Sequence, residues 1–175
     1  EIRMSPVSVP PKLVWDNILT LPYYQPGKPI EEVKRELGLD DVVKLASNEN
    51  PYGPSPKVLE ALSRAAGEIH RYPDALGFEL RRRLSDIYEV DQDQVGLGNG
   101  SDEIVSMLCS AFLYPGEEGI VATPSFIRYA TAIQMVQGRT VSVPTRHWVH
   151  DLDAMAEAVT EKTKIVFVCN PNNPT

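Results

Sequence analysis

The sequence predicts an α/β fold, a partial doubly wound domain on a mainly parallel sheet, preceded by an extended N-terminal arm. Two observations support this prediction. From about residue 91 onward, short apolar runs alternate with segments of helical periodicity, which is typical of parallel strands joined by right-handed crossovers. In addition, three loops of unusual polar composition follow predicted strands, and the ligands of open parallel sheets bind at the carboxyl ends of strands.

The N-terminal segment, residues 1 to about 30, is set apart by its proline content. It holds six of the fifteen prolines and two adjacent tyrosines, Tyr23 and Tyr24. Because proline fixes φ and lacks a backbone N–H, this segment cannot be helical throughout, and it shows no strand alternation. We expect an extended arm that lies across another surface, such as a partner subunit; the alternative is a disordered tail.

Residues 30–90 are predicted to contain three helices and one short strand. The first helix covers residues 30–37 and ends at Gly38, and the strand covers residues 41–45. Ser55 followed by Pro56 is a helix-start signal, because the serine hydroxyl caps free amides and proline suits the first turn. The second helix has an apolar face that we expect to be buried: Val58, Leu59, Leu62 and Ala66. The third helix also presents an apolar face: Leu80, Leu84, Ile87 and Tyr88.

The remaining residues, 91–175, are predicted to form four strands with a helix between each pair. The strands are expected at residues 95–97, 119–122, 139–143 and 164–169. The last helix would be capped by Asp151. Each helix carries apolar residues that would face the sheet: Ile104, Val105, Leu108 and Phe112 in the first, Tyr129, Ile133 and Val136 in the second, and Leu152, Met155 and Val159 in the third.

These elements suggest three segments. Residues 1–40 would form the arm and a short helix, residues 41–90 would belong partly to a small domain and lead into a large one, and residues 91–175 would form the first part of the large domain. The chain begins with Glu1 instead of Met and stops directly after a strand and its Asn-Asn-Pro turn. We therefore expect both ends to be trimmed and the large domain to be truncated.

The composition restricts the classes of partner. The net charge is −7 and no Lys/Arg block could follow a phosphate backbone, so we expect no nucleic-acid partner. No segment approaches the length of a membrane span and no secretory signal is visible, so we expect a cytoplasmic protein with no membrane partner. Cys109 and Cys169 lie in apolar runs, as expected for buried thiols in a reducing compartment. No metal site is predicted.

The loop at residues 98–103, Gly-Asn-Gly-Ser-Asp-Glu, leads from a predicted strand into a helix. Glycine allows the backbone to approach a ligand, and the first amides of a helix point outward at the positive end of its dipole. A phosphate would be held by the amides of about Gly100, Ser101 and Asp102, together with the Ser101 hydroxyl. Alternatively, Ser101 is only an N-cap and the glycines only permit the turn. Neither the dinucleotide-binding pattern nor the P-loop pattern is met.

Two further loops carry candidate binding residues. Phe126 follows a strand end, where its ring could stack on a planar ligand; alternatively it is a core residue. In the loop at residues 170–175 two prolines bracket two asparagines, which fixes the backbone. A rigid Asn173 amide could donate a hydrogen bond to an anionic oxygen; alternatively this loop is only a turn.

Taken in order, these segments resemble fold-type I pyridoxal-phosphate aminotransferases, most closely the histidinol-phosphate aminotransferases. The resemblance covers nearly the whole chain; each motif alone is weakly specific, whereas the ordered set is strongly specific. It implies the large-domain fold of that family and pyridoxal 5′-phosphate as cofactor. Six segments carry it: LPYYQPGKPIEEVKRELGL (21–39), KLASNENPYGPSP (44–56), HRYPD (70–74), GNGSDE (98–103), ATPSFIRY (122–129) and CNPNNPT (169–175).

The resemblance implies roles for residues in all three loops. Gly100, Ser101 and Asp102 would bind the cofactor phosphate. Phe126 would stack on the pyridine ring, at a place where family members also carry tyrosine. Asn173 would hydrogen-bond the 3-hydroxyl oxygen of the ring.

Further implied roles lie at the subunit interface and the substrate. Tyr72 would reach the cofactor phosphate of the partner subunit, and Tyr24 and Asn48 would face the substrate. We expect a homodimer, because Tyr72 and the arm make sense only against a second subunit. The family's pyridine-nitrogen Asp, Schiff-base Lys and substrate-binding Arg would all lie beyond Thr175. We therefore expect no catalytic residue in this chain and no activity from the 175 residues alone.

The implied reaction moves an amino group between glutamate and imidazole-acetol phosphate, giving 2-oxoglutarate and histidinol phosphate, in histidine biosynthesis. The protonated pyridine of the cofactor would act as electron sink in a ping-pong reaction. Threonine-phosphate decarboxylases and aromatic-amino-acid aminotransferases of the same fold show much the same loops; residues 22–39 favour histidinol phosphate. Two alternatives from other classes are a non-catalytic aminotransferase-like binding module and a Rossmann-type nucleotide binder.

Overall fold

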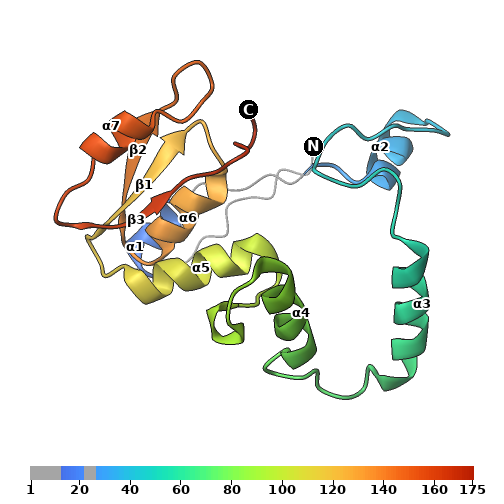
Figure 1. Cartoon of the computed structure of the whole chain (residues 1–175). Helices are drawn as coiled ribbons and strands as arrows, with labels where there is room; N and C mark the ends of the chain where they lie inside the picture. The colour runs from blue at the N-terminus through green and yellow to red at the C-terminus, as the bar shows by residue number, and fades with distance from the viewer. Residues whose placement is uncertain (1–12, 22–26) are drawn as a thin grey trace. The chain divides into compact units, whose positions relative to one another are not determined.

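The computed structural model describes residues 13–21 and 27–175 (Figure 1). Contacts within the chain divide it into two compact units. One comprises Val90–Thr175 together with the described residues that precede Pro22, and we call it the sheet unit. The other, Tyr23–Glu89, is described here as the helical unit. Each is treated by itself.

The sheet unit is built on three parallel strands in the order β2-β1-β3. The strands are β1 (Glu118–Thr123), β2 (Arg139–Pro144) and β3 (Thr163–Phe167). The pairing of β1 with β2 runs without a break, whereas the pairing of β1 with β3 shifts after Glu118. The parallel pairing predicted from the alternation of apolar runs and helices is therefore confirmed.

Helices cover both faces of this sheet (Figure 1). On one face, α5 (Gly100–Phe112) and α6 (Ile127–Met135) pack on inward side chains of β1 and β3, chiefly Val121 and Phe167. On the other face, Met155 of α7 (Leu152–Glu157) packs on the alternate residues of β1 and β2, which are Ile120, Ala122 and Val143. Successive side chains of a strand point to opposite faces, so β1 serves two cores. The doubly wound α/β fold is confirmed.

The helices of the sheet unit are buried along narrower stripes than predicted. In α5, Val105 and Cys109 are buried, whereas Leu108 and Phe112 are 41% and 58% exposed. Residues four apart lie on one helix face, and the row through Val105 and Cys109 is the one that meets the sheet. In α7 only Met155 is buried among its predicted inward residues; Leu152 and Val159 are exposed.

Gly119 sets the distance between α6 and the sheet. A Cβ atom at this position would lie 2.5 Å from Cδ1 of Ile133, a contact that real Cβ atoms do not make. Ile133 is fully buried. The absence of a side chain on β1 at this point therefore lets α6 approach closely.

The described part of the N-terminal segment holds one short helix, α1 (Asp16–Leu19). The Nδ2 atom of Asn17 donates a hydrogen bond to the backbone oxygen of Gln134, 2.7 Å away at the end of α6. The rest of the predicted arm, residues 1–12 and 22–26, lies outside the described residues.

The helical unit contains α2 (Ile30–Leu37), α3 (Pro56–Ala65), a 3₁₀ turn (Ala66–Glu68) and α4 (Phe78–Tyr88). The predicted helix boundaries are confirmed where local signals define them. Gly38 ends α2 with φ 64°, a conformation that favours glycine. The Ser55 hydroxyl accepts a hydrogen bond from the amide of Val58 at 3.4 Å, and Pro56 occupies the first turn of α3.

Three expectations about these regions are wrong. Residues 41–45 and 95–97 form no strand, because no described segment pairs with either, and a strand exists only through its partner. The apolar face of α3 is not buried: Val58, Leu59 and Leu62 are 47%, 54% and 62% exposed.

Cys109 is buried as predicted, and burial raises the pKa of its thiol, whereas Cys169 is half-buried. None of the described helices has the length and apolar character needed to span a membrane.

Candidate functional site

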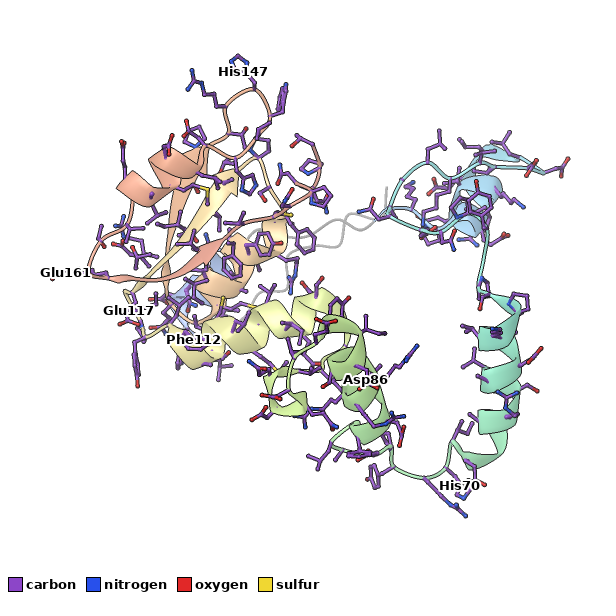
Figure 2. The ribbon with its side chains drawn as sticks, in the orientation of Figure 1. His70, Asp86, Phe112, Glu117, His147 and Glu161 are labelled. Carbon is purple, nitrogen blue, oxygen red and sulfur yellow. The ribbon has the colours of Figure 1, made fainter. Side chains whose placement is uncertain are left out.

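Three loops meet at the carboxyl edge of the sheet, because parallel strands end on the same side. Residues 124–126 follow β1, residues 145–150 follow β2, and residues 168–175 follow β3. The loop after β2 folds back as a short hairpin in which Arg146 pairs with Val149. His147 lies at its tip, at the opposite end of the sheet unit from Glu117 and Glu161 (Figure 2).

The N-terminus of α5 is open. The helix begins at Gly100, whose φ is 71°, and a Cβ atom there would meet nothing within 4 Å. The N-cap residue is Asn99, so the interpretation of Ser101 as a mere N-cap is wrong. Ser101 and Asp102 are exposed, and no described residue accepts a hydrogen bond from their amides. This turn therefore presents free N–H groups at the positive end of the helix dipole.

Acidic side chains flank this open turn. The Glu103 carboxylate accepts hydrogen bonds from the Asn99 amide at 2.5 Å and from the Asn99 side chain at 3.1 Å. The two carboxylate oxygens of Asp102 lie 2.7 and 2.9 Å from Nε of Arg128 in the first turn of α6. The Arg128 guanidinium thus ties the start of α5 to the start of α6 and offsets the charge of Asp102.

Phe126 lies directly before α6 and is half-buried. Its ring packs edge-on against Tyr129, with centroids 5.6 Å apart, and Tyr129 stacks on Phe167 at 4.6 Å. Burial, followed by a hydrogen bond with Cys169, raises the pKa of Tyr129 to about 12, so this phenol is neutral at neutral pH. Phe126 is therefore an edge member of an aromatic cluster and is not fully buried.

Asn172 is the centre of the loop that follows β3. Its Oδ1 atom lies 2.9 Å from Oγ of Ser125 and 3.1 Å from Nε2 of His150. Its Nδ2 atom donates to the backbone oxygen of Pro124 at 3.1 Å and to Oγ1 of Thr175 at 2.6 Å. Because these partners come from the loops after all three strands, Asn172 holds the carboxyl edge together.

Asn173, the neighbour of this centre, is half-buried. Its side-chain amide makes no hydrogen bond to any described residue. Polar atoms of this kind are available to a ligand.

The remaining predicted site residues do not belong to the sheet unit. Asn48 and Tyr72 lie in the helical unit, where both are exposed, Tyr72 completely. Tyr24 lies outside the described residues. Among the described residues, no group of three His, Cys, Asp or Glu side chains could hold a metal ion.

Sequence reasoning missed the residues that hold the loops together, which are Ser125, His150, Asn172 and Thr175. The only signal in the sequence is the doubled asparagine at 172–173, which predicts a ligand contact by Asn173 but does not reveal the role of Asn172. Beside this network lies an open hollow of about 600 Å³, lined by the hairpin and by residues 168–172. Neither Ser101 nor Phe126 lines it, so it is distinct from the mouth of α5.

Comparison with known proteins defines the class of this protein. The family model for class I and II aminotransferases matches residues 40–175. The chain therefore belongs to the class I and II aminotransferase family, and the alternative of a Rossmann-type nucleotide binder is excluded.

Individual relatives show which group within this family the chain resembles. A histidinol-phosphate aminotransferase of Moorella thermoacetica is 51% identical over 98% of this chain and 44% of its own length. One of Brevibacillus brevis is 49% identical over 90% of the chain and 43% of its own length. The chain thus spans less than half of the curated relatives that it matches, and the resemblance to this group is confirmed.

Solved structures confirm the fold. The histidinol-phosphate aminotransferase of Sinorhizobium meliloti, in complex with pyridoxal-5′-phosphate, superposes with a TM-score of 0.82 at 24% identity, covering 94% of this chain and 44% of that one. An alanine aminotransferase of Pyrococcus furiosus superposes with a TM-score of 0.75 at 26% identity, covering 93% and 45%. The fold-type I aminotransferase architecture is shared by enzymes whose names state different substrates, so the fold alone does not select one.

Proposed function

We propose that this chain is part of a histidinol-phosphate aminotransferase, which uses pyridoxal 5′-phosphate to move an amino group between histidinol phosphate and 2-oxoglutarate. The observation that carries the proposal is the 51% identity to the Moorella thermoacetica enzyme, sustained over 98% of the chain. In the biosynthetic direction glutamate and imidazole-acetol phosphate react, as a step of histidine biosynthesis.

The first turn of α5 fits the cofactor phosphate. The space around Gly100 and the unpartnered, exposed amides of Ser101 and Asp102 suit an anionic ester, which would accept their hydrogen bonds. The Ser101 hydroxyl would add a donor. Because Arg128 offsets the charge of Asp102, the approach of an anion meets less repulsion than the local sequence suggests.

The other two loops fit the cofactor ring. The exposed part of Phe126 would stack on the pyridine, and the free amide of Asn173 would donate a hydrogen bond to the 3-hydroxyl oxygen. When bound, pyridoxal phosphate supplies an electron sink for the substrate carbon that carries the amino group. Phe126 and Asn173 would orient that sink.

We propose that the Schiff-base lysine and its aspartate and arginine partners come from sequence outside these 175 residues. The described lysines of the sheet unit support this view. Lys162 and Lys164 lie at the start of β3, at the amino ends of the strands, whereas the three loops follow the carboxyl ends. Neither can reach the carboxyl edge, so no described lysine of this unit can serve the site.

A homodimer and a substrate contact complete the proposal. The fully exposed Tyr72 would reach the cofactor phosphate of a second subunit, and the exposed Asn48 would face the substrate. The role proposed for Tyr24 rests on the family resemblance.

The proposal is tested on the intact protein that contains this chain. Titration with pyridoxal phosphate should produce the absorption band of an enzyme-bound cofactor, and histidinol phosphate should be a better amino donor than phenylalanine. Threonine phosphate should release no carbon dioxide. The 175-residue chain alone, assayed in parallel, should show no transamination. A colourless intact protein would overturn the cofactor assignment, and a clear preference for phenylalanine would overturn the substrate.

A further inference from the structure

The starting observation is that the side-chain amide of Asn172 uses its full hydrogen-bonding capacity. A primary amide has two N–H donors and two acceptor lone pairs. In Asn172 the donors meet Pro124 O and Thr175 Oγ1, and the acceptor meets Ser125 Oγ and His150 Nε2. Rotating this amide by 180° would place its NH₂ group against donors and its oxygen against acceptors, so the side chain has a single favourable orientation.

That orientation determines which ring nitrogen of His150 donates to Asn172. The backbone oxygen of Pro124 can only accept, so the NH₂ group of Asn172 must face it. The Oδ1 atom then faces His150, and Nε2 of His150 must carry the proton that it donates. The other ring nitrogen, Nδ1, is buried and has no hydrogen-bond partner among the described residues. His150 therefore acts here as a hydrogen-bond donor through Nε2.

We infer that Asn172, with its amide held between Pro124 and His150, is a positioning residue that holds Asn173 at the cofactor. This inference rests on the proposed function. Asn173 lies between Asn172 and Pro174, and the ring of Pro174 restricts the backbone of the residue before it. Because Asn172 is bound to the loops after β1 and β2, the backbone that carries the Asn173 side chain is held in place at the carboxyl edge. Neither Asn172 nor His150 touches the cofactor.

The first test compares variants of His150 in the intact protein by the dissociation constant of pyridoxal phosphate, measured on apoprotein. His150→Leu removes the donor, and we expect about tenfold weaker binding, the effect of roughly one hydrogen bond. His150→Gln keeps an N–H at similar reach and should restore most of the affinity. His147→Leu is the matched control: His147 is exposed at the hairpin tip (Figure 2), so its variant should bind like the wild type.

The second test asks whether His150 acts through Asn173. In an Asn173→Ala background, His150→Leu should cause no further loss of cofactor affinity, because the group being positioned is gone. Equal losses in both backgrounds would indicate a merely structural role and overturn the inference, as would unchanged affinity in His150→Leu. A wild-type protein that binds no pyridoxal phosphate would overturn the proposed function together with this inference. Wild-type binding with additive losses would overturn the positioning role alone.

Discussion

Gly119 on β1 is the glycine at which an added side chain would come closest to a neighbouring atom among the described glycines. Gly119→Ala would place a methyl group 2.5 Å from Cδ1 of the fully buried Ile133. We expect a loss of about 1–3 kcal/mol in the free energy of unfolding, the usual effect of an overpacked core. Gly96→Ala is the control, since a Cβ there meets nothing within 4 Å. Urea denaturation of both variants measures the difference; equal stabilities would contradict the packing argument.

Glu118 is a buried carboxyl group that makes the stability of the sheet unit depend on pH. Its carboxylate is 2% exposed and accepts hydrogen bonds from Arg139, Thr160 and Thr163. The hydrogen bond with Arg139, followed by that with Thr160, holds the pKa of Glu118 below its ordinary value of 4.5. Since the folded-state pKa is depressed, the stabilisation is complete above pH 4.5 and is lost as the pH falls through the folded-state pKa.

The corresponding experiment follows the melting temperature against pH. Glu118→Gln should melt below the wild type at pH 7, and the gap should close as the pH falls below 4.5 and through the depressed pKa of Glu118. Glu161→Gln, at an exposed position, should follow the wild type throughout. A gap that stays constant with pH would show that the charge of Glu118 contributes nothing.

At the same scale, the candidate site shows which residue roles a sequence can reveal. Gly100 and Phe126 were identifiable because a glycine before a helix and an aromatic after a strand are local signals. Asn172 was not, since its partners Ser125 and His150 lie 47 and 22 residues away. A hydrogen-bond centre is defined by neighbours in space, and nothing in the loop sequence distinguishes it from Asn173.

At the scale of single elements, α7 depends on its N-cap. The Asp151 side chain accepts a hydrogen bond from the Ala154 amide at 3.1 Å. Asp151→Ala should lower the free energy of unfolding by about 1 kcal/mol, the usual effect of losing a cap. Asp153→Ala removes a carboxylate from the same turn without removing the cap, so the difference between the two variants isolates the hydrogen bond. Chemical denaturation of the two proteins should rank Asp153→Ala as the more stable.

The Asp102–Arg128 pair couples two helix starts and should influence anion binding. In Arg128→Gln the Asp102 carboxylate loses its counter-charge beside the open turn of α5. We expect pyridoxal phosphate to bind about fivefold more weakly, with a smaller effect at high salt. Arg146→Gln, which changes the net charge equally on the exposed hairpin, is the control. Equal affinities of the two variants, measured by titration, would exclude a local effect of Arg128.

Element boundaries were predictable where the deciding contacts are local. Ser55 with Pro56, Gly38 and Asp151 each marked a helix end that the structure confirms, because caps and left-handed ends involve residues within one turn. The strands predicted at 41–45 and 95–97 were wrong because their apolar runs have no described partner strand. The buried residues of α5 were predicted incorrectly because α5 is apolar on more than one face, and the packing against the sheet decides which face is buried.

At the scale of the whole molecule, the fold class was predictable because the alternation of strands and helices admits few arrangements. The burial of the helices in the helical unit was not predictable. An apolar helix face indicates that the helix can be covered on that side, but it does not specify which part of the molecule covers it. Val58 and Leu62 of α3 illustrate this: they are four residues apart, on one helix face, yet are 47% and 62% exposed.

The two units should therefore differ in local stability. In the 175-residue chain we expect backbone amides of β1, where Ile120, Val121 and Ala122 are buried, to exchange with deuterium slowly. Amides of α3 and α4, which contain no buried residue, should exchange faster, since few apolar contacts protect them. Hydrogen exchange followed by mass spectrometry measures both. Equal protection of β1 and α3 would contradict this picture.

The hydrogen bonds of Asn172 also bear on how the chain acquires its structure. The bond from Ser125 to Asn172 joins residues 47 positions apart, with two crossover connections between them. Contacts of such high contact order form only after the intervening segments have folded, because closing a long loop costs entropy before the contact contributes. During synthesis, the hydrogen bonds that Asn172 makes at the carboxyl edge can therefore form only once residue 172 has left the ribosome, even if β1 and β2 are already paired.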